Sequence, residues 1–429
     1  MAIINEWLSI DKTSGTGNAQ ITLTASSYQE LVERTQSLVI QGQRESVYLN
    51  VKQNGVIPKT EEELKQQYFW VEFEETNGTI TFQPRWTAGS NSIPAGKYSN
   101  IAYSFDGISW ASGTTIKMND ATIVYLENKS GRLNNIATAD IGKYEWEIIN
   151  FDKRARVGGP INTLSSFKKG CFYELFSGNS YLTDASKLIL PWKTMEKMCY
   201  YGMFSGCKSL IRAPKLPATT LADRCYDGMF SGCTSLTTAP ELPVTTLVDG
   251  CYAQMFSGCT SLTTAPELPA TRLANYCYYL MFHGCTSLTT APVLPATKVY
   301  DECYGSMFYG CTNLVNAPTL PATTLVGGCY SAMFRGCTSL TTAPVLPAKS
   351  LTHQESNGSY TGCYNSMFYG CTSLNYIKML GDYTDWSYTR NWVYGVAPTG
   401  TFIKLENSSI KVDGYDGIPS GWTVETATE

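Results

Sequence analysis

The chain repeats itself with one fixed period over about half of its length. The repeat is clearest in the cysteines, which form seven pairs with an offset of eight residues inside every pair. Successive pairs begin twenty-six positions apart five times, as from Cys199 to Cys225, and thirty-four positions apart at the last step, from Cys329 to Cys363. A fixed period in this range is typical of a solenoid, whose units are too small to bury their own apolar face and therefore stack. The pairs are Cys199/Cys207, Cys225/Cys233, Cys251/Cys259, Cys277/Cys285, Cys303/Cys311, Cys329/Cys337 and Cys363/Cys371.

One unit, residues 225–250, indicates how a coil is built. Leu221, Cys225 and Met229 are four residues apart, which predicts one face of a short helix. Gly232 is expected to end that helix. The following Thr-Ser-Leu-Thr-Thr predicts a short strand, bounded by two prolines. The predicted fold is therefore an α/β solenoid of about eight 26-residue units over residues 166–380.

The fifteen cysteines could be disulfide staples, metal ligands or buried thiols. Along a helix, an offset of eight residues spans about 12 Å, which is too far for a disulfide within one unit. The second cysteines of successive units should stack about 4.8 Å apart, where a bridge is feasible, but seven in a row cannot all pair. No cysteine pair has the spacing of a zinc knuckle. We therefore expect unpaired core thiols. Their number is odd because Cys171 belongs to a degenerate first unit in which Asn179 takes the second cysteine's place.

The repeat also carries a family resemblance. The recurring Met-Phe-x-Gly-Cys-Thr-Ser-Leu, followed by a strand between prolines, resembles the BspA-type leucine-rich repeats. The unit found here is a little longer than the commoner units of that family. The resemblance implies that the fold is an α/β leucine-rich-repeat solenoid and that it presents a non-enzymatic surface for recognition or adhesion, often outside the cell.

Residues 1–56 show a different pattern, in which apolar and polar residues alternate. Strands are predicted around Trp7, Ile21, Leu38 and Val47, which gives a small all-β sandwich. This segment resembles the BACON domain, a family named for a proposed role in carbohydrate binding and found in gut Bacteroidetes and their phages. The resemblance rests on Trp7-Leu-x-Ile, Ser14-Gly-Thr-Gly-Asn, Arg34 before a Val-rich strand, and Val51-Lys-Gln. No binding residue follows from it, because the family has no defined sugar-binding triad.

Two further segments flank the repeats. Residues 57–165 predict a second β-sandwich that caps the first coil, and Asp106-Gly107 marks a tight turn in it. Residues 381–429 lose the repeat and predict the opposite cap. The strands of the first cap are expected to start at Tyr68, Thr79, Ile101 and Thr122, and the second cap carries Trp386, Trp392 and Trp422.

Composition and motifs exclude several classes of function. Lys and Arg total 32 against 36 for Asp and Glu, so no basic footprint for nucleic acid is present. No apolar run is long enough to span a bilayer, so membrane insertion is not expected. Only two histidines occur, and catalytic and metal-binding motifs are absent. We therefore expect no enzymatic activity, no cofactor and no metal site.

The positions that vary within the repeat are the candidates for binding. The residue after Met-Phe is Ser in the first three complete units and then changes to larger side chains. Tyr and Arg are enriched in binding hot spots, and aromatic rings can stack on sugars. Drift at exposed positions of a duplicated array would explain the variation equally well. Tyrosines directly after the first cysteine, such as Tyr226 and Tyr252, are expected to form a structural ladder instead. The candidate binding residues are His283, Tyr309, Arg335 and Tyr369, with the inserted loop 354–361 beside them.

Three settings fit these features. The first is a phage virion component, such as a fibre, decoration or tail-associated protein, that binds bacterial-surface or mucus glycans or proteins. An N-terminus without an export signal and unpaired thiols fit assembly in the bacterial cytoplasm. The second is a secreted or cell-surface adhesin whose signal peptide was removed, and the third is an intracellular scaffold or glycan-processing enzyme. The partners expected for the first setting are a glycan or host cell-surface protein and other virion proteins. The sequence leaves a homo-oligomer open.

Overall fold

The structure is a computed structural model of the chain. It describes residues 60–86, 101–106, 109–113, 115–127, 136–137, 144–161, 172–351, 362–382 and 388–427, together with five strands before residue 54. The chain forms two compact units. One comprises Met1–Leu64 with Ser104–Trp110, and the other comprises Lys65–Tyr103 with Ala111–Glu429.

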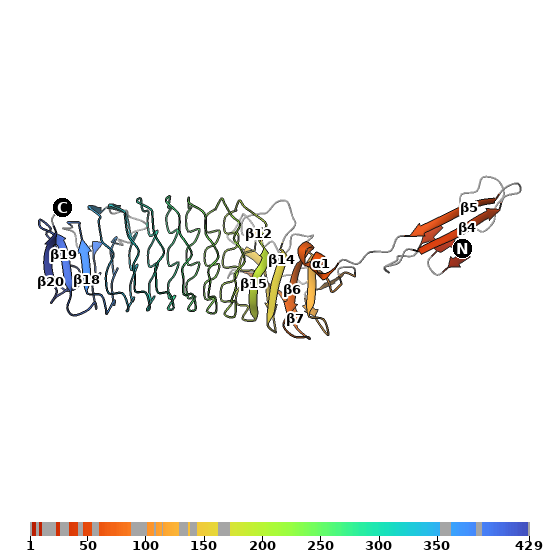
Figure 1. Cartoon of the computed structure of the whole chain (residues 1–429), viewed down its shortest axis with the longest axis horizontal. Helices are drawn as coiled ribbons and strands as arrows, with labels where there is room; N and C mark the ends of the chain where they lie inside the picture. Colours follow the sequence, from red (N-terminus) through yellow and green to blue (C-terminus); the bar gives the residue numbers. More distant parts are fainter. Residues whose placement is uncertain are drawn as a thin grey trace. The chain divides into compact units, whose positions relative to one another are not determined.

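The strands before residue 54 form two antiparallel groups (Figure 1). Strands β1 to β3 make a three-stranded sheet, and β4 pairs with β5 over eight residues each. The strands predicted around Trp7, Ile21, Leu38 and Val47 correspond to β2 to β5, which confirms the β character of this segment. How the two groups pack lies outside the described residues. The strands are β1 Ala2–Asn5, β2 Leu8–Ile10, β3 Leu23–Ala25, β4 Arg34–Gln41 and β5 Ser46–Gln53.

Residues 60–161 contribute a helix and two sheets. Helix α1 (Glu61–Gln67) starts at a capping box, because the Thr60 hydroxyl accepts from the Glu63 amide and the Glu63 carboxylate accepts from the Thr60 amide. The strand orders are β15-β14-β6-β11-β8-β9 and β10-β7-β13-β12. The strands predicted at Tyr68, Thr79, Ile101 and Thr122 correspond to β6, β7, β8 and β11. The bounds are β6 Phe69–Phe73, β7 Thr79–Trp86, β8 Ile101–Ser104, β9 Ala111–Gly113, β10 Thr115–Lys117, β11 Ile123–Glu127, β12 Ile136–Ala137, β13 Tyr144–Phe151, β14 Ala155–Pro160 and β15 Leu182–Ile189.

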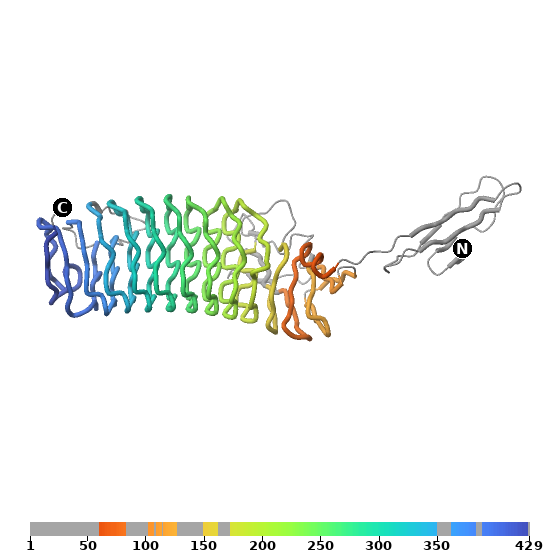
Figure 2. The backbone as a smooth tube through the Cα atoms, in the orientation of Figure 1, coloured from red at the N-terminus to blue at the C-terminus, as the bar shows by residue number. Residues whose placement is uncertain are grey.

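A solenoid of about ten turns extends over residues 155–427. Its first rung is β14, which pairs antiparallel with β6 on one side and parallel with β15 on the other. Parallel bridges continue from coil to coil, for example Arg212 to Thr238 and Thr238 to Thr264. The coils follow one another in chain order along the stack (Figure 2). Rungs therefore also occur in the two segments that the sequence assigns to caps. The later strands are β16 Thr324–Leu325, β17 Ser350–Leu351, β18 Tyr376–Met379, β19 Thr401–Leu405 and β20 Thr423–Ala427.

The helix predicted in each unit is wrong, and with it the α/β class of the solenoid. Residues 225–232 form consecutive turns, because every fourth residue adopts a positive φ: 52° at Arg224, 61° at Gly228 and 73° at Gly232. In the described part of the solenoid no α-helix occurs. Apolar residues do recur every four positions in the sequence, but this spacing arises from a four-residue turn and not from a helix of 3.6 residues per turn.

The turns are held together between coils as well as within each coil. In a helix every amide bonds inside its own segment, whereas here alternate amides donate to the next coil. The amides of Tyr226 and Phe230 donate to the carbonyls of Cys251 and Met255, at 3.1 and 2.9 Å. Between them, the amide of Gly228 also donates to the next coil, whereas the amides of Asp227 and Met229 donate back within their own coil, to Arg224 at 3.3 Å and to Tyr226 at 3.2 Å. We call this side of the solenoid the turn face.

The predicted strand is also shorter than expected. Of Thr-Ser-Leu-Thr-Thr, Leu236 is fully buried, and the last residue, Thr238, makes a one-residue bridge to each neighbouring coil. Pro240 follows two residues later and has no amide hydrogen for a ladder, which ends the pairing at once.

Rows of identical side chains fill the core. The tyrosines after each first cysteine stack from Tyr200 to Tyr364 with ring centroids 5.7–6.2 Å apart, which confirms that Tyr226 and Tyr252 belong to a structural ladder. A second row of phenylalanines runs from Phe176 to Phe368 at 5.4–5.8 Å. Trp392 contacts the last ring of both rows, at 6.3 and 5.9 Å. It therefore closes the aromatic core of the regular coils.

The cysteines form two more rows in this core. The fourteen described cysteines are all buried and free, as expected from the sequence; Cys171 lies outside the described residues. Each second cysteine donates its thiol to a carbonyl of the preceding coil, for example Cys259 to Phe230 at 3.1 Å. Asn179 does the same with its side-chain amide, which donates to the Ile149 carbonyl at 3.1 Å. Asn179 thus replaces a cysteine while keeping its hydrogen bond.

Candidate recognition surface

The turn face presents a row of side chains at the position after each Met-Phe. We call this row the column. Its residues lie one above another because the glycine after each one donates its amide to the column residue of the next coil, for example Gly284 to the Tyr309 carbonyl at 2.7 Å and Gly310 to the Arg335 carbonyl at 2.8 Å. The column comprises Ser205, Ser231, Ser257, His283, Tyr309, Arg335 and Tyr369.

The structure brings the four predicted residues of the column together, each partly exposed. The rings of His283 and Tyr309 meet edge to face at a centroid distance of 4.9 Å. The Arg335 guanidinium lies between two tyrosines, 5.3 Å from the Tyr309 ring centroid and 4.3 Å from that of Tyr369. Such cation–π contacts fix the guanidinium in place. The inserted loop 354–361, predicted to lie beside them, falls outside the described residues.

The column continues into a part of the chain where the repeat is no longer recognisable. Tyr394 stacks on Tyr369 at 4.9 Å, and Tyr415 stacks on Tyr394 at 5.3 Å. These two tyrosines are the most exposed aromatic members, at 43% and 53%. Sequence reasoning missed both. The signal for Tyr394 is its place after Trp392-Val393, which stands where other coils have Met-Phe, and Gly395 follows it as Gly370 follows Tyr369.

The arrangement limits how a ligand could bind. Because Arg335 covers one face of each neighbouring tyrosine, a sugar cannot stack there in the way the sequence suggests. Ring edges, phenol oxygens and the guanidinium remain for contact. Arg335 has no carboxylate within 4.0 Å among the described residues, so its charge is not neutralised within this part of the protein. Burial lowers the pKa of His283, which favours its neutral form, and its Nδ1 lies 3.2 Å from the Ser257 hydroxyl.

Two carboxyl groups, the buried Asp227 and the half-buried Glu302, lie elsewhere on the turn face. Asp227 is only 2% exposed, and burial raises its pKa to about 7 even though the Arg224 guanidinium, 3.6 Å away, acts in the opposite direction. Burial, together with the charge of Asp301, likewise raises the pKa of Glu302 to about 7. Glu302 lies over the backbone of Gly305 and Gly328, where any side chain would collide with it.

No group of three or more His, Cys, Asp or Glu side chains in the described part of the chain is arranged to hold a metal ion. No described helix is long and apolar enough to cross a membrane.

Comparison with known proteins gives one match. Residues 228–355 match the profile of the BspA type leucine rich repeat region, in six copies. The match covers the central part of the regular coils and includes His283, Tyr309 and Arg335, whereas Tyr369 lies outside it. No curated protein and no solved structure matches the chain. Residues 228–355 are therefore a region of BspA type leucine-rich repeats.

Proposed function

We propose that the chain is a non-enzymatic recognition protein that binds its ligand through the column on the turn face. BspA-like repeats are typical of surface adhesion proteins. The observation that carries the proposal is the unbroken row His283, Tyr309, Arg335, Tyr369, Tyr394 and Tyr415, in which each side chain contacts the next. A row of rigid aromatic side chains around one arginine supplies contact area at low cost in side-chain entropy.

The ligand that we propose is a glycan or protein of a bacterial surface or of mucus. Glycans present many hydroxyl groups, and phenol oxygens and a guanidinium can bind these groups from the edges of the rings. The setting that we propose is a phage virion, with other virion proteins as further partners. The alternative is a secreted or cell-surface adhesin. The occurrence of BspA-like repeats in surface adhesion proteins supports this alternative.

A glycan array tests the ligand class. The full chain should bind a subset of bacterial or mucin glycans, and Tyr309→Ser/Tyr369→Ser should lose these signals. Serine is the matched replacement because Ser205, Ser231 and Ser257 occupy the same position in earlier coils. Absence of any glycan signal from the full chain would exclude the carbohydrate ligand. Binding that the double variant retains would exclude the column as the site.

The neighbouring genes test the setting. Capsid and tail genes beside the coding sequence would support a virion component, and immunogold labelling of the particles should then detect the protein on them. A neighbouring locus for sugar uptake, with the protein on the cell surface, would instead support the adhesin.

A further inference from the structure

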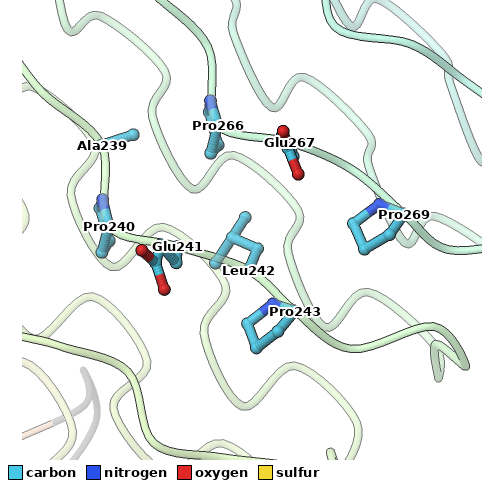
Figure 3. A pocket seen from close by; sticks show the side chains of 8 residues that line it. All are labelled: Ala239, Pro240, Glu241, Leu242, Pro243, Pro266, Glu267 and Pro269. Atoms are coloured by element: carbon cyan, nitrogen blue, oxygen red, sulfur yellow. The ribbon is translucent and has the colours of Figure 1, made fainter.

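On another side of the solenoid, a groove of about 410 Å³ lies between two neighbouring coils, and Figure 3 shows the side chains that line it. It lies between residues 239–243 of one coil and residues 266–269 of the next. Each of these segments is an extended arm between two bridge positions, such as Thr238 and Thr246. Side chains alternate along the arm: Leu242 is buried, whereas Glu241 and Pro243 are exposed. The lining residues are Ala239, Pro240, Glu241, Leu242, Pro243, Pro266, Glu267 and Pro269.

The arms are rich in proline. Four of the eight lining residues are proline, which has no amide hydrogen to give to a neighbouring coil. Among the described residues, no hydrogen bond joins the backbone of 239–244 to another coil. Carbonyl groups of the arms are therefore left without a protein donor. The four prolines of the lining thus supply no amide donor, whereas its two glutamates supply carboxylate acceptors.

The groove also carries negative charge. Glu241 and Glu267 occupy the same position in adjacent arms, and neither has an ion-pair partner within 4.0 Å in the described part of the chain. Lys215 holds this position one coil earlier and forms no ion pair with Glu241. Later coils carry Val293, Thr319 and Val345 there, so this pairing of two carboxylates occurs at one step of the stack only.

We propose that this groove binds a lysine side chain from an extended segment of a partner protein. A lysine ammonium offers three donors and no acceptor, which matches a lining with two carboxylates and four prolines that lack an amide hydrogen. Its four methylene groups can lie along the prolines and Leu242 while the charge reaches the carboxylates. An amino sugar fits less well, because its hydroxyl oxygens would also need donors from the site. The proposal concerns a different face from the column and stands independently of it.

The test is a titration of the full chain, with labelled leucine methyl groups, followed by NMR. The probe is a blocked peptide with lysine at alternate positions, and the matched probe has glutamine instead. The lysine peptide should shift the methyl signals of Leu242 and Leu268, and the glutamine peptide should not. Glu241→Val/Glu267→Val should weaken binding about tenfold, the combined effect of two exposed ion pairs.

The chain supplies its own controls. Valine occupies the equivalent position at Val293 and Val345, so the double variant should keep the melting temperature of the wild type. If the double variant melts at a lower temperature, Glu241→Thr/Glu267→Thr is used instead, because Thr319 occupies the equivalent position in a later coil. Glu425→Val removes an exposed carboxylate on β20 and should leave the affinity unchanged.

Two results would contradict the proposed site: an equal loss of affinity with Glu425→Val, or unchanged binding of the lysine peptide by the double variant. Equal affinity and equal shifts with free glucosamine would overturn the choice of a protein partner.

Discussion

At the scale of single residues, burial decides the chemistry of this protein. Its described thiols are buried in the core, where the charged thiolate is strongly disfavoured. Burial raises the pKa of Cys259 and of Cys371 to about 12. These groups act as packing residues with one weak hydrogen bond each, and they are not poised for redox or metal chemistry.

The thiols should therefore be unreactive in the folded protein. A thiol reagent at pH 8 should modify none of the fourteen described cysteines in native buffer, because the thiolate is the reacting species. In denaturant without reductant, the reagent should react with close to all fifteen cysteines of the chain. Finding almost none under these conditions would show that the core is cross-linked.

Glu302 should make the protein less stable as the pH rises. Its pKa is raised from 4.5 to about 7 in the folded state, so the folded protein holds a proton that the unfolded chain releases. The stabilisation is complete below about pH 4.5 and is lost as the pH rises through about 7. Melting temperatures of wild type and Glu302→Gln should diverge across this window, with the wild type losing more. Parallel curves would show that Glu302 does not carry the effect.

At the scale of structural elements, the four-residue turn explains the repeat better than any helix. Successive turns direct successive pairs of residues into the core, first Cys225 and Tyr226, then Met229 and Phe230. The residue that closes a turn needs a positive φ, and after each Met-Phe-x this residue is glycine. The turn explains why a period of four and an invariant glycine occur together in the sequence.

Replacing that glycine should destabilise the coil. Gly232 has a φ of 73°, and an L-residue in this region costs about 1–2 kcal/mol. Its nearest non-neighbour atoms would lie 3.6 Å from an added Cβ, so the cost is conformational and not a clash. Urea unfolding should show this loss for Gly232→Ala. Ser231→Ala, one residue earlier and partly exposed, is the control and should leave the midpoint unchanged.

The phenylalanine row should be the most sensitive element of the core. Phe256 is fully buried between Phe230 and Phe282, with centroids at 5.8 and 5.7 Å. Phe256→Ala removes both contacts and leaves a cavity, which costs about 3–5 kcal/mol of unfolding free energy. The exposed Thr238→Ala serves as the comparison in the same urea experiment. A loss below about 1 kcal/mol for Phe256→Ala would mean that neighbouring coils close the gap.

The repeat pattern predicts the solenoid, its buried thiols and its tyrosine ladder, because residues one period apart occupy equivalent positions in adjacent coils and therefore stack on one another. It does not predict the turns, because apolar residues four apart are equally compatible with a helix when inter-coil hydrogen bonds are unknown. The column was predicted over the regular coils, but Tyr394 and Tyr415 were missed because Cys, Met and Phe are replaced there. Strand β13 was missed although Tyr144, Trp146 and Ile148 alternate with polar residues.

At the scale of the whole molecule, the stacking of coils brings single side chains together into continuous surfaces. Because the coils are nearly identical, equivalent residues of successive coils lie side by side. A few substitutions at one exposed position are therefore enough to create a binding surface while the core stays the same. The column and the proline-lined groove are both made in this way. They lie on different faces of one solenoid and differ in chemistry, the first being aromatic with one cation and the second acidic.

The central claim is that the column binds the ligand, and the affinity of one matched variant tests it most directly. Wild type and Tyr309→Ser/Tyr369→Ser should be titrated by calorimetry with the strongest ligand from the array. We predict a loss of at least tenfold, since removing a hot-spot aromatic residue costs about 2 kcal/mol or more, with an unchanged melting temperature. Equal affinity of the two proteins would contradict the claim.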